Sequence, residues 1–488
     1  MTRLSNTTLD RLPAKVARPA FDRAGARTGI VHLGLGAFHR AHQAAYTDAV
    51  LAGGDLGWGI CGVSLRSPET RDALQPQDGL YTLAVRDGSG DRFHVIGAIL
   101  ESLVAPEDPE AVLARLCAAD TRIVSLTVTE KGYCHLPATG ELDEAHPDIR
   151  HDLAHPGRPK SAVGFLVEAI ARRRAAGIPP FTVLSCDNLP ANGQTAGRVV
   201  ARFAALRDPE LGRFVQSEVS FPSSMVDRIV PATTDADRAL VAGALEQEDR
   251  WPVMAEPFTQ WVIEDRFPAG RPAWDATFVR EVEPFELMKL RLLNGSHSTL
   301  SYLGYLAGHE TVAETMGAPG FEALLRGLMR EEASPTLAPL PGFDLAAYRD
   351  QLLARFRNPA LRHRTWQIAM DGSQKLPQRL LGTIRDRLAA GEAFDRLALG
   401  VAAWMVYVRG TDERGGPIDV RDPLAKDLAE ATHGHTDAAG LMAACLGFET
   451  VFGRDLPASA TFRDAVERAL SELLREGAAR TVARFGTA

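Results

Sequence analysis

The sequence is poor in cysteine, lacks a surplus of basic residues and contains no long apolar run. Only 5 of its 488 residues are cysteines, and no two of them form a C-x-x-C pair. A disulfide-stapled secreted domain carries a denser and even set, so we expect reduced thiols inside a cell. Lysine and arginine total 54 against 62 acidic residues, a net charge of −8. Nucleic acids and anionic membranes attract basic surfaces, so this balance argues against both as partners.

The apolar runs are also too short for a membrane protein. The longest covers residues 397–408, whereas a helix that crosses a bilayer needs about 20 apolar residues. The first ten residues contain no apolar run of the signal-peptide kind. Hydrophobic residues make up 45% and charged residues 24%, as in ordinary globular proteins. We expect a cytoplasmic protein of two or three domains, either a monomer or a small homo-oligomer.

Two patterns divide the chain near residue 280. Before it, short apolar runs alternate with helical stretches, which predicts βαβ units and a parallel sheet; the runs cover 29–34, 58–65, 123–127 and 181–185. After it, apolar residues recur at helical spacing over 321–332, 344–356, 376–389, 397–408 and 461–485, and the Pro-rich segment 334–344 is a connector. The sequence predicts an α/β fold: a doubly wound sheet in residues 1–280, then a mostly α-helical domain in residues 281–488.

A glycine-rich turn, G-L-G-A-F-H, follows the first predicted strand. Glycines such as Gly34 and Gly36 let the backbone approach a pyrophosphate at the positive end of the next helix. His39 stands where the G-x-G-x-x-G pattern has its third glycine, so a βα turn without a ligand remains the alternative. After the second predicted strand, the carboxylate of Glu69 would favour NAD, whereas Arg66 would accept the 2′-phosphate of NADP. We expect NAD and keep NADP as the alternative.

Three histidines near this turn suggest a metal site, but their surroundings disfavour it. His32, His39 and His42 have no cysteine or carboxylate nearby at ligand spacing. We therefore expect no metal cofactor.

The stretch F-E-L-M-K-L-R-L-L-N-G-S-H predicts a helix with one polar wall over residues 285–297. Asn294 and His297 are three residues apart and share a helical face. Lys289 lies two turns earlier, about 80° round the axis. In a water-poor cleft the pKa of a lysine falls from about 10.4 toward neutrality, so Lys289 would exchange a proton with an alcohol or ketone. A core helix with a few satisfied polar groups is the alternative.

Polar residues also follow other predicted strands. Asn188 comes directly after the run 181–185, and the segments 127–133 and 225–228 occupy similar positions. Open α/β sheets bind their ligands at the carboxyl ends of the strands. An asparagine amide there would hold an oxygen on which negative charge develops. The alternative for residues 185–193 is a plain Asn/Pro/Gly turn.

Taken together, these motifs resemble the mannitol 2-dehydrogenase and fructuronate reductase family, long-chain polyol dehydrogenases that need no metal. The resemblance runs nearly end to end and is carried by G-I-V-H-L-G-L-G-A-F-H-R-A-H-Q (29–43), I-V-S-L-T-V-T-E-K-G-Y (123–133), S-C-D-N (185–188), M-V-D-R-I (225–229), E-P-F-T-Q-W-V-I-E-D (256–265) and K-L-R-L-L-N-G-S-H (289–297). It implies an expanded Rossmann domain followed by a helical domain. The implied activity is the NAD-dependent interconversion of a secondary alcohol and a ketone on an open-chain sugar derivative.

The resemblance also implies roles for single residues. Lys289 would be the general acid/base, Asn188 and Asn294 would hold the reacting oxygen, and His297 would help to place the substrate. The residues implied in the cofactor site are Gly34, Gly36, Ala37 and Phe38 of the turn, with Asp227 on the nicotinamide side. Lys375 corresponds to a lysine of a substrate-contacting loop.

One segment bears on the substrate. Mannitol 2-dehydrogenases resemble one another in an arginine five residues before the glycine of D-G-S, and Gln367 stands there instead. In this respect the segment resembles the fructuronate reductase branch. Arg364, Lys375 and Arg379 would supply cations for a substrate carboxylate, which a neutral polyol does not need. The first hypothesis is D-fructuronate and D-mannonate; the alternative is mannitol or another polyol such as arabinitol or sorbitol.

Two other functions remain open. A non-catalytic dinucleotide sensor would use the same glycine turn but would not need Lys289, Asn294 and His297 on one wall. An epimerase would keep its NAD bound and return the hydride to the substrate.

Overall fold

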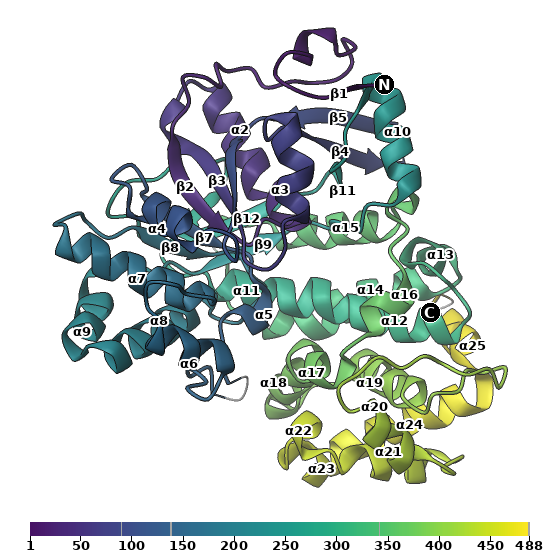
Figure 1. Ribbon diagram of the computed structural model, residues 1–488. Helices are drawn as coiled ribbons and strands as arrows, with labels where there is room; N and C mark the ends of the chain where they lie inside the picture. Colours follow the sequence, from purple (N-terminus) through teal and green to yellow (C-terminus); the bar gives the residue numbers. More distant parts are fainter. Residues whose placement is uncertain (89, 137–138, 341, 487–488) are drawn as a thin grey trace. The chain divides into compact units, whose positions relative to one another are not determined.

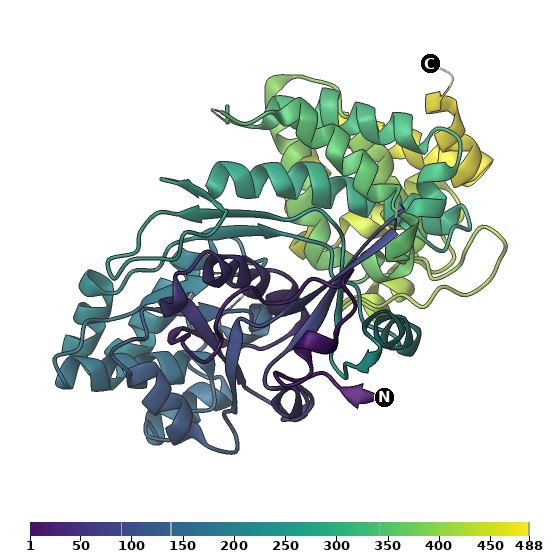
Figure 2. The same ribbon diagram turned by 90° about the horizontal axis from the view of Figure 1, so that it is seen from above.

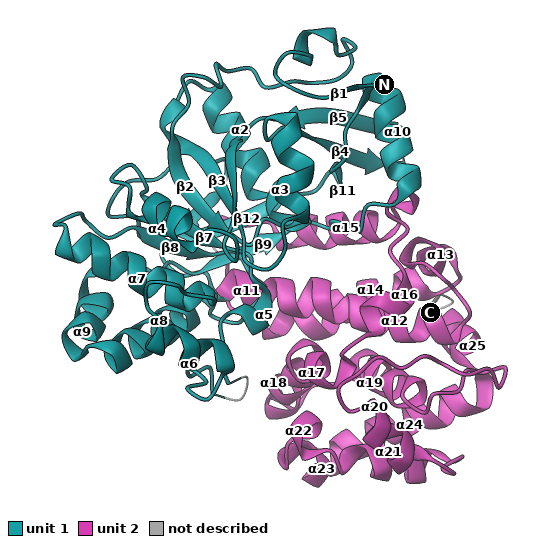
Figure 3. Cartoon of the chain, viewed as in Figure 1, with its two compact units in different colours: residues 1–283 teal, residues 284–488 magenta. Residues whose placement is uncertain are grey.

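The computed structural model describes all residues except 89, 137–138, 341 and 487–488. The chain divides into two compact units, residues 1–283 and 284–488 (Figure 3). Unit 1 combines sheets and helices, and unit 2 consists mainly of helices. The predicted fold class is therefore confirmed. Within the predicted connector 334–344, Pro341 lies outside the described residues.

Five parallel strands form the main sheet of unit 1 (Figure 1). They lie in the order β6-β3-β2-β7-β8, with bounds Ile99–Val104 (β6), Gly59–Ser64 (β3), Thr28–Leu33 (β2), Ile123–Leu126 (β7) and Thr182–Ser185 (β8). Four of these strands are the runs expected from the sequence. The strand order reverses between β2 and β7, and such a switch point is where doubly wound sheets bind ligands.

Alternation along β2 shows why this sheet has two buried faces. Val31 and Leu33 pack into a core with α4, α7 and α8, whereas Ile30 packs into a second core with α2. The helices of unit 1 are α1 (Ala37–Ala41), α2 (Gln43–Ala52), α3 (Glu69–Leu74), α4 (Pro109–Cys117), α5 (Thr129–Gly132), α6 (Pro147–Ala154), α7 (Ala162–Ala175), α8 (Asn192–Arg207), α9 (Pro209–Glu218) and α10 (Asp235–Leu245). Because both faces are covered, β2, β3, β7 and β8 are buried along almost their whole length.

Smaller sheets complete unit 1. One has the order β11-β4-β5 and another the order β13-β12-β9, and β1 pairs with β10. Their bounds are Thr2–Arg3 (β1), Tyr81–Asp87 (β4), Gly90–Ile96 (β5), Ser224–Asp227 (β9), Gln247–Glu248 (β10), Val253–Ala255 (β11), Gln260–Glu264 (β12) and Thr277–Val279 (β13). In β9 and β12, Val226 and Trp261 join the same core as Ile30. The end of β9 is thereby fixed against the main sheet.

Unit 2 is organised around a central helix. Its helical elements are α11 (Glu283–Lys289), η4 (Leu290–Asn294), α12 (Gly295–Leu306), α13 (Val312–Gly317), α14 (Phe321–Gly327), η5 (Leu328–Ala333), α15 (Leu345–Phe356), α16 (Thr365–Ala369), α17 (Gly372–Leu376), η8 (Pro377–Leu381), α18 (Gly382–Ala390), α19 (Asp395–Tyr407), α20 (Ala425–Thr432), α21 (Ala438–Leu446), α22 (Glu449–Phe452), α23 (Asp455–Ala458), α24 (Ala460–Glu476) and α25 (Ala478–Ala483). Helix α12 is almost entirely buried and packs against α16 and α19. Seen from above, the green and yellow ribbon of this unit is again helical (Figure 2).

Two details differ from the expected helices. The segment 461–485 is not one helix, because Gly477 takes φ +79° and separates α24 from α25. Likewise, π-helical turns interrupt three of the predicted helices: η4 the one over residues 285–297, η5 the one over 321–332 and η8 the one over 376–389. Among the described residues, no helix is both long enough and apolar enough to span a bilayer.

The core of unit 1 predicts the effect of truncating an apolar side chain. Leu166 of α7 is 1% exposed and Leu240 of α10 is 38% exposed. We expect Leu166→Ala to lower the free energy of unfolding by about 2–5 kcal/mol, because it leaves a cavity in the core. Leu240→Ala is the matched control, with an expected change below about 0.5 kcal/mol. Urea unfolding measures both, and equal losses would contradict this packing.

Candidate active site

A cavity of about 1130 Å³ lies at the carboxyl ends of the main-sheet strands in unit 1. Segments that follow four of these strands line it: Gly34–Gly36 after β2, Ser64–Ser67 after β3, Ala105–Pro106 after β6 and Thr127–Thr129 after β7. The cavity therefore occupies the switch point of the sheet, the usual position of a dinucleotide in this class of fold.

The glycine turn after β2 is tightly fixed. Gly34 takes φ +101°, and a Cβ at this position would lie 2.1 Å from the Thr127 carbonyl oxygen. Thr127 Oγ1 donates to the Gly34 carbonyl over 2.7 Å, and His32 Nε2 lies 3.1 Å from the same oxygen. Burial lowers the pKa of His32 to about 3, so this imidazole is neutral. At Gly36, by contrast, a Cβ would meet nothing closer than 3.8 Å, so the space beside the turn is open to a ligand.

The remaining residues predicted for the cofactor site take different positions. Ala37 and Phe38 open α1 directly after the turn. Arg66 lines the cavity together with Ser67 and Thr70. Glu69 begins α3 with an exposed side chain and is not among the lining residues. The wall beyond the second strand thus offers a guanidinium and two hydroxyls.

Asn188 and Asp227 lie at the ends of β8 and β9. Asn188 is exposed, and Asp227 is 3% exposed. Asn192 Nδ2 donates to the carbonyl oxygen of Asp187 over 3.0 Å and to that of Ser224 over 2.7 Å. One buried amide therefore ties the two strand ends together. Sequence reasoning assigned no role to Asn192, although it lies in the asparagine cluster singled out there.

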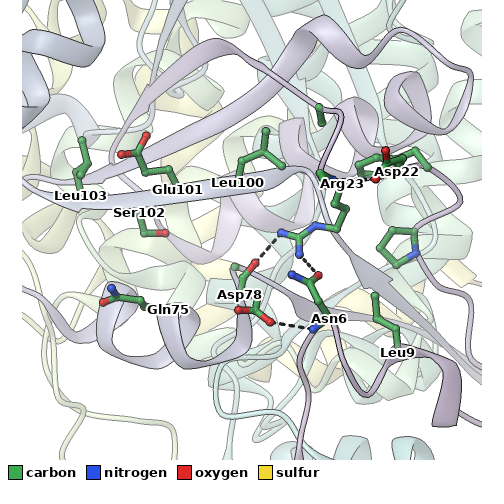
Figure 4. Close-up of a pocket in the computed structure, with 15 residues that line it drawn as sticks. Asn6, Leu9, Asp22, Arg23, Gln75, Asp78, Leu100, Glu101, Ser102 and Leu103 are labelled. Carbon is green, nitrogen blue, oxygen red and sulfur yellow. Dashed lines mark hydrogen bonds between the residues drawn. The ribbon is translucent and has the colours of Figure 1, made fainter.

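A second cavity of unit 1, of about 840 Å³, has its polar groups engaged with one another. The Arg23 guanidinium donates to Asn6 Oδ1 and, over 2.6 Å, to the carbonyl oxygen of Asp78. The Asn6 amide N–H donates to the Asp78 carboxylate over 2.9 Å (Figure 4). These contacts fasten the N-terminal segment to the loop before β4, which is a structural role.

In unit 2, the π-helical turn changes how Lys289 and His297 are arranged. Lys289 ends α11 and is 7% exposed, and His297 in α12 is also 7% exposed. A π-helix rotates less per residue than an α-helix because it bonds i to i+5. In an ideal α-helix, at about 100° per residue, two residues eight positions apart lie about 80° apart round the axis. The π-helical turn reduces this angle, so Lys289 and His297 lie nearer to one face. Asn294, the last residue of the wide turn, lies between them in sequence and is partly exposed.

The imidazole of His297 lies among aromatic and basic groups. Its ring centroid is 4.6 Å from that of Phe356 and 5.5 Å from that of His363. Burial lowers the pKa of His297 well below its usual value, and His363, Arg355, Arg379 and Lys289 lower it further. Burial also lowers the pKa of His363 to about 4. Within the described residues, His297 Nε2 and His363 Nδ1 are buried without a hydrogen-bond partner, so a polar ligand would satisfy them.

Gly295 allows the segment that carries Arg379 to approach the groups around His297. A Cβ at Gly295 would lie 2.8 Å from the Arg379 carbonyl oxygen, so glycine lets η8 approach the start of α12. Arg379 Nη1 then lies 3.3 Å from Ser298 Oγ, one residue beyond His297. Arg355 and His363 were not singled out from the sequence. His363 stands between two arginines in R-H-R, and this local sequence gives no reason to select the histidine rather than its neighbours.

The other residues predicted to contact substrate are exposed or are bound to other groups of unit 2. Arg364 is exposed, with Nε 3.5 Å from the Glu310 carboxylate. Gln367 is also exposed. Lys375 Nζ donates to the Met370 carbonyl oxygen over 2.5 Å. Of the three cations predicted to face a carboxylate, Arg379 is among the groups whose charge contributes most to the lowered pKa of His297.

Two of the three histidines near the glycine turn pack against each other. His32 and His39 stack with ring centroids 3.5 Å apart. In the part of the chain that the structure describes, no three histidine, cysteine or acidic side chains form a group able to hold a metal ion.

Comparisons with known proteins agree over both units. The mannitol dehydrogenase Rossmann domain matches residues 28–276, and the mannitol dehydrogenase C-terminal domain matches residues 281–474. D-mannonate oxidoreductase of Escherichia coli (strain K12) is 48% identical over 96% of this chain and 98% of its own length. A mannitol 2-dehydrogenase of Pyricularia oryzae is 41% identical over 96% of this chain and 95% of its own.

Two solved structures are also similar. The Pseudomonas fluorescens mannitol 2-dehydrogenase ternary complex with NAD and D-mannitol is 43% identical, with a TM-score of 0.88 over 99% of both chains. A D-sorbitol dehydrogenase in substrate-free form is 34% identical, with a TM-score of 0.91 over 99% of this chain and 100% of that one.

The glycine turn yields a prediction about cofactor binding. Gly34→Ala forces a Cβ against the Thr127 carbonyl and into a positive φ, so we expect the dissociation constant for NADH to rise at least about tenfold. Gly177→Ala is the matched control, because Gly177 also has a positive φ, +67°, but a Cβ there would have no neighbour within 4 Å. Nucleotide fluorescence titration measures both. Wild-type affinity in Gly34→Ala would contradict the placement of the cofactor at this turn.

Proposed function

This chain belongs to the mannitol dehydrogenase family and is an oxidoreductase, and from that premise we propose that it interconverts D-fructuronate and D-mannonate, with NAD as the hydride carrier. The relative named D-mannonate oxidoreductase supports this choice through its 48% identity over nearly the whole chain. So does Gln367, which occupies the position where the resemblance places an arginine in mannitol 2-dehydrogenases.

The observation that carries the substrate assignment is the charge around His297. Arg355, Arg379 and Lys289 all act on this imidazole as positive charges, whereas His363, whose pKa is lowered to about 4, is neutral near pH 7. A carboxylate bound beside such groups is stabilised by charge-assisted hydrogen bonds, which are about twice as strong as neutral ones. D-Fructuronate carries a carboxylate, whereas D-fructose carries none. The surroundings of His297 are therefore better suited to the sugar acid.

The cofactor proposal is based on the glycine turn. Open space beside Gly36 and the fixed Gly34 suit the close approach of a pyrophosphate. A similar solved structure is named as a complex with NAD. Arg66, Ser67 and Thr70 on the wall also suit a 2′-phosphate, so NADP is the second candidate cofactor.

In the reductive direction, each side chain would have one task. NADH, when bound, supplies the hydride. Lys289 holds a proton at Nζ and gives it to the oxygen of the substrate carbonyl. Asn294 donates an amide N–H to that oxygen while its charge grows, and the family resemblance assigns the same task to Asn188. His297, neutral because it is buried, orients substrate hydroxyls.

A second candidate substrate is the pair D-fructose and D-mannitol, or another polyol. The positions of Arg364 and Lys375 favour it, because the first is paired with Glu310 and the second is bound to a backbone carbonyl. Arg364 and Lys375 are thus engaged with other groups of the protein.

Lys289 tests the proposed chemistry. We expect Lys289→Ala to lower kcat by roughly 10²–10⁴, the contribution of a general acid/base, while the affinity for NADH is retained. Lys426→Ala is the control, because Lys426 is exposed and paired with Glu430. Steady-state turnover and nucleotide titration separate the two effects. Full activity of Lys289→Ala at neutral pH would show that another group moves the proton.

Arg379 tests the substrate class. Arg379→Gln removes a cation next to His297, so we expect KM for D-fructuronate to rise about tenfold or more and KM for D-fructose to change little. Arg364→Gln, which alters a surface pair, serves as the control and leaves both values unchanged. Equal effects of Arg379→Gln on both substrates would contradict a role in carboxylate binding.

A further inference from the structure

A strained turn forms part of the wall of the unit 1 cavity. Thr129 takes φ +64°, a left-handed conformation that is exceptional for a β-branched residue. Val128 before it has φ −106° and ψ 1°, and both residues line the cavity. Successive residues of right- and left-handed conformation aim their N–H groups to one side and form a nest for an anion. Strain of this kind persists where the surroundings hold it, often at functional sites.

The anion in this nest is the carboxylate of Asp187. The Val128 N–H donates to Asp187 Oδ2 over 3.0 Å, and the Thr129 N–H donates to Oδ1 over 3.0 Å. The Tyr133 hydroxyl donates to Oδ2 over 2.8 Å and lies 2.5 Å from Ser185 Oγ. Burial raises the pKa of Tyr133 well above its usual value, so this hydroxyl remains a donor. The carboxylate is thus bound on both oxygens by the cavity wall.

The main chain of Asp187 is held as well. Its carbonyl oxygen accepts from Asn192 Nδ2, whose amide also binds the backbone of Ser224 in β9. The next residue along the chain is Asn188. The peptide that carries Asn188 is therefore fixed on one side by the cavity wall and on the other by β9.

We infer that Asp187 is a positioning residue that couples the cofactor cavity to Asn188. Its carboxylate keeps the 128–129 turn in the strained form that shapes the cavity wall. Because Asp187 directly precedes Asn188, it also fixes the position of the Asn188 backbone. This inference rests on the proposed function, which places a nicotinamide dinucleotide in the cavity and the reacting oxygen at Asn188.

Asp187→Asn tests the inference. An asparagine keeps one oxygen acceptor, but its NH2 group replaces the other oxygen and would face an N–H donor. The nest then loses a hydrogen bond, so the turn relaxes. We expect the dissociation constant for NADH to rise at least tenfold and kcat to fall in the same variant. A variant of Asn188 alone, Asn188→Ala, lowers kcat and leaves NADH affinity unchanged, because it does not touch the nest.

Asp249→Asn is the matched control. Asp249 is also buried, and its carboxylate accepts from the Thr82 N–H over 2.6 Å and from the Trp251 N–H over 2.9 Å. None of these three residues is among those lining the cavity in the described structure. We expect this variant to lose stability while the folded protein binds NADH within twofold of the wild type.

Rescue distinguishes positioning from a general loss of structure. Glycine adopts a positive φ without strain, so Thr129→Gly in the Asp187→Asn background should restore most of the NADH affinity. Thr129→Gly alone is the reference for this rescue, because it removes the same side chain while Asp187 stays in place. Where Asp187→Asn does not fold, Tyr133→Phe removes one donor to the carboxylate, and we expect about a threefold loss of NADH affinity.

The possible outcomes distinguish a failure of the inference from a failure of the proposed function. Wild-type NADH affinity and kcat in Asp187→Asn, or in Tyr133→Phe where that variant replaces it, would overturn the inference and leave the proposed function intact. A double variant that binds no tighter than Asp187→Asn would also overturn it. Failure of the wild-type protein to bind NADH or NADPH would overturn the proposed function together with the inference.

Discussion

Parallel pairing of the five main strands is the constraint on which the rest of unit 1 depends. Because all five run in one direction, their carboxyl ends meet at one edge, and the residues after them must form a common wall. Polar groups buried at such an edge need partners. His32 binds the glycine turn, Asp187 binds the 128–129 turn, and Asn192 joins β8 to β9. These hydrogen bonds hold the segments that follow the strands in place around the cavity.

In unit 2, the π-helical turn η4 has a similar role, because it positions the residues predicted to act in the site. The π-helical turn before Gly295 rotates Lys289 toward the face of His297, and the glycine admits η8 with Arg379. Basic side chains then surround a buried, neutral imidazole. Positive charges of this kind suit an anionic or strongly polar ligand, which is why the arrangement bears on the substrate class.

The sequence predicts the parts of this molecule that depend on local pattern. Buried strands such as β2 are continuous apolar runs, and the class of fold followed from them. Strand β6 was missed because its central residues are only partly buried and include Glu101 and Ser102. The π-helical turn could not be expected either, since residues 290–294 fit an α-helix equally well. The roles assigned to Lys289, Asn188, Asn294 and His297 remain predictions.

Tertiary contacts decide which members of a motif act together. Arg66 and Glu69 are three residues apart, yet Arg66 lines the cavity, whereas Glu69 begins α3 and is not among the lining residues. Arg364 and Arg379 lie in one basic segment, but Arg364 pairs with Glu310, whereas the charge of Arg379 lowers the pKa of His297. Asp187 was visible only as the neighbour of Asn188, because its partners lie some sixty positions earlier in the chain. No local pattern contains such information.

The central claim is that a hydride passes between a nicotinamide and the carbonyl carbon of an open-chain sugar acid. The most direct measurement is transfer of deuterium from NADH labelled at the nicotinamide C4 position to D-fructuronate, followed by mass spectrometry. The account predicts D-mannonate carrying one deuterium, formed in step with an equal amount of free NAD. Binding of labelled NADH with no sugar product would indicate a sensor, and a changed sugar without release of NAD would indicate an epimerase; either result would contradict the account.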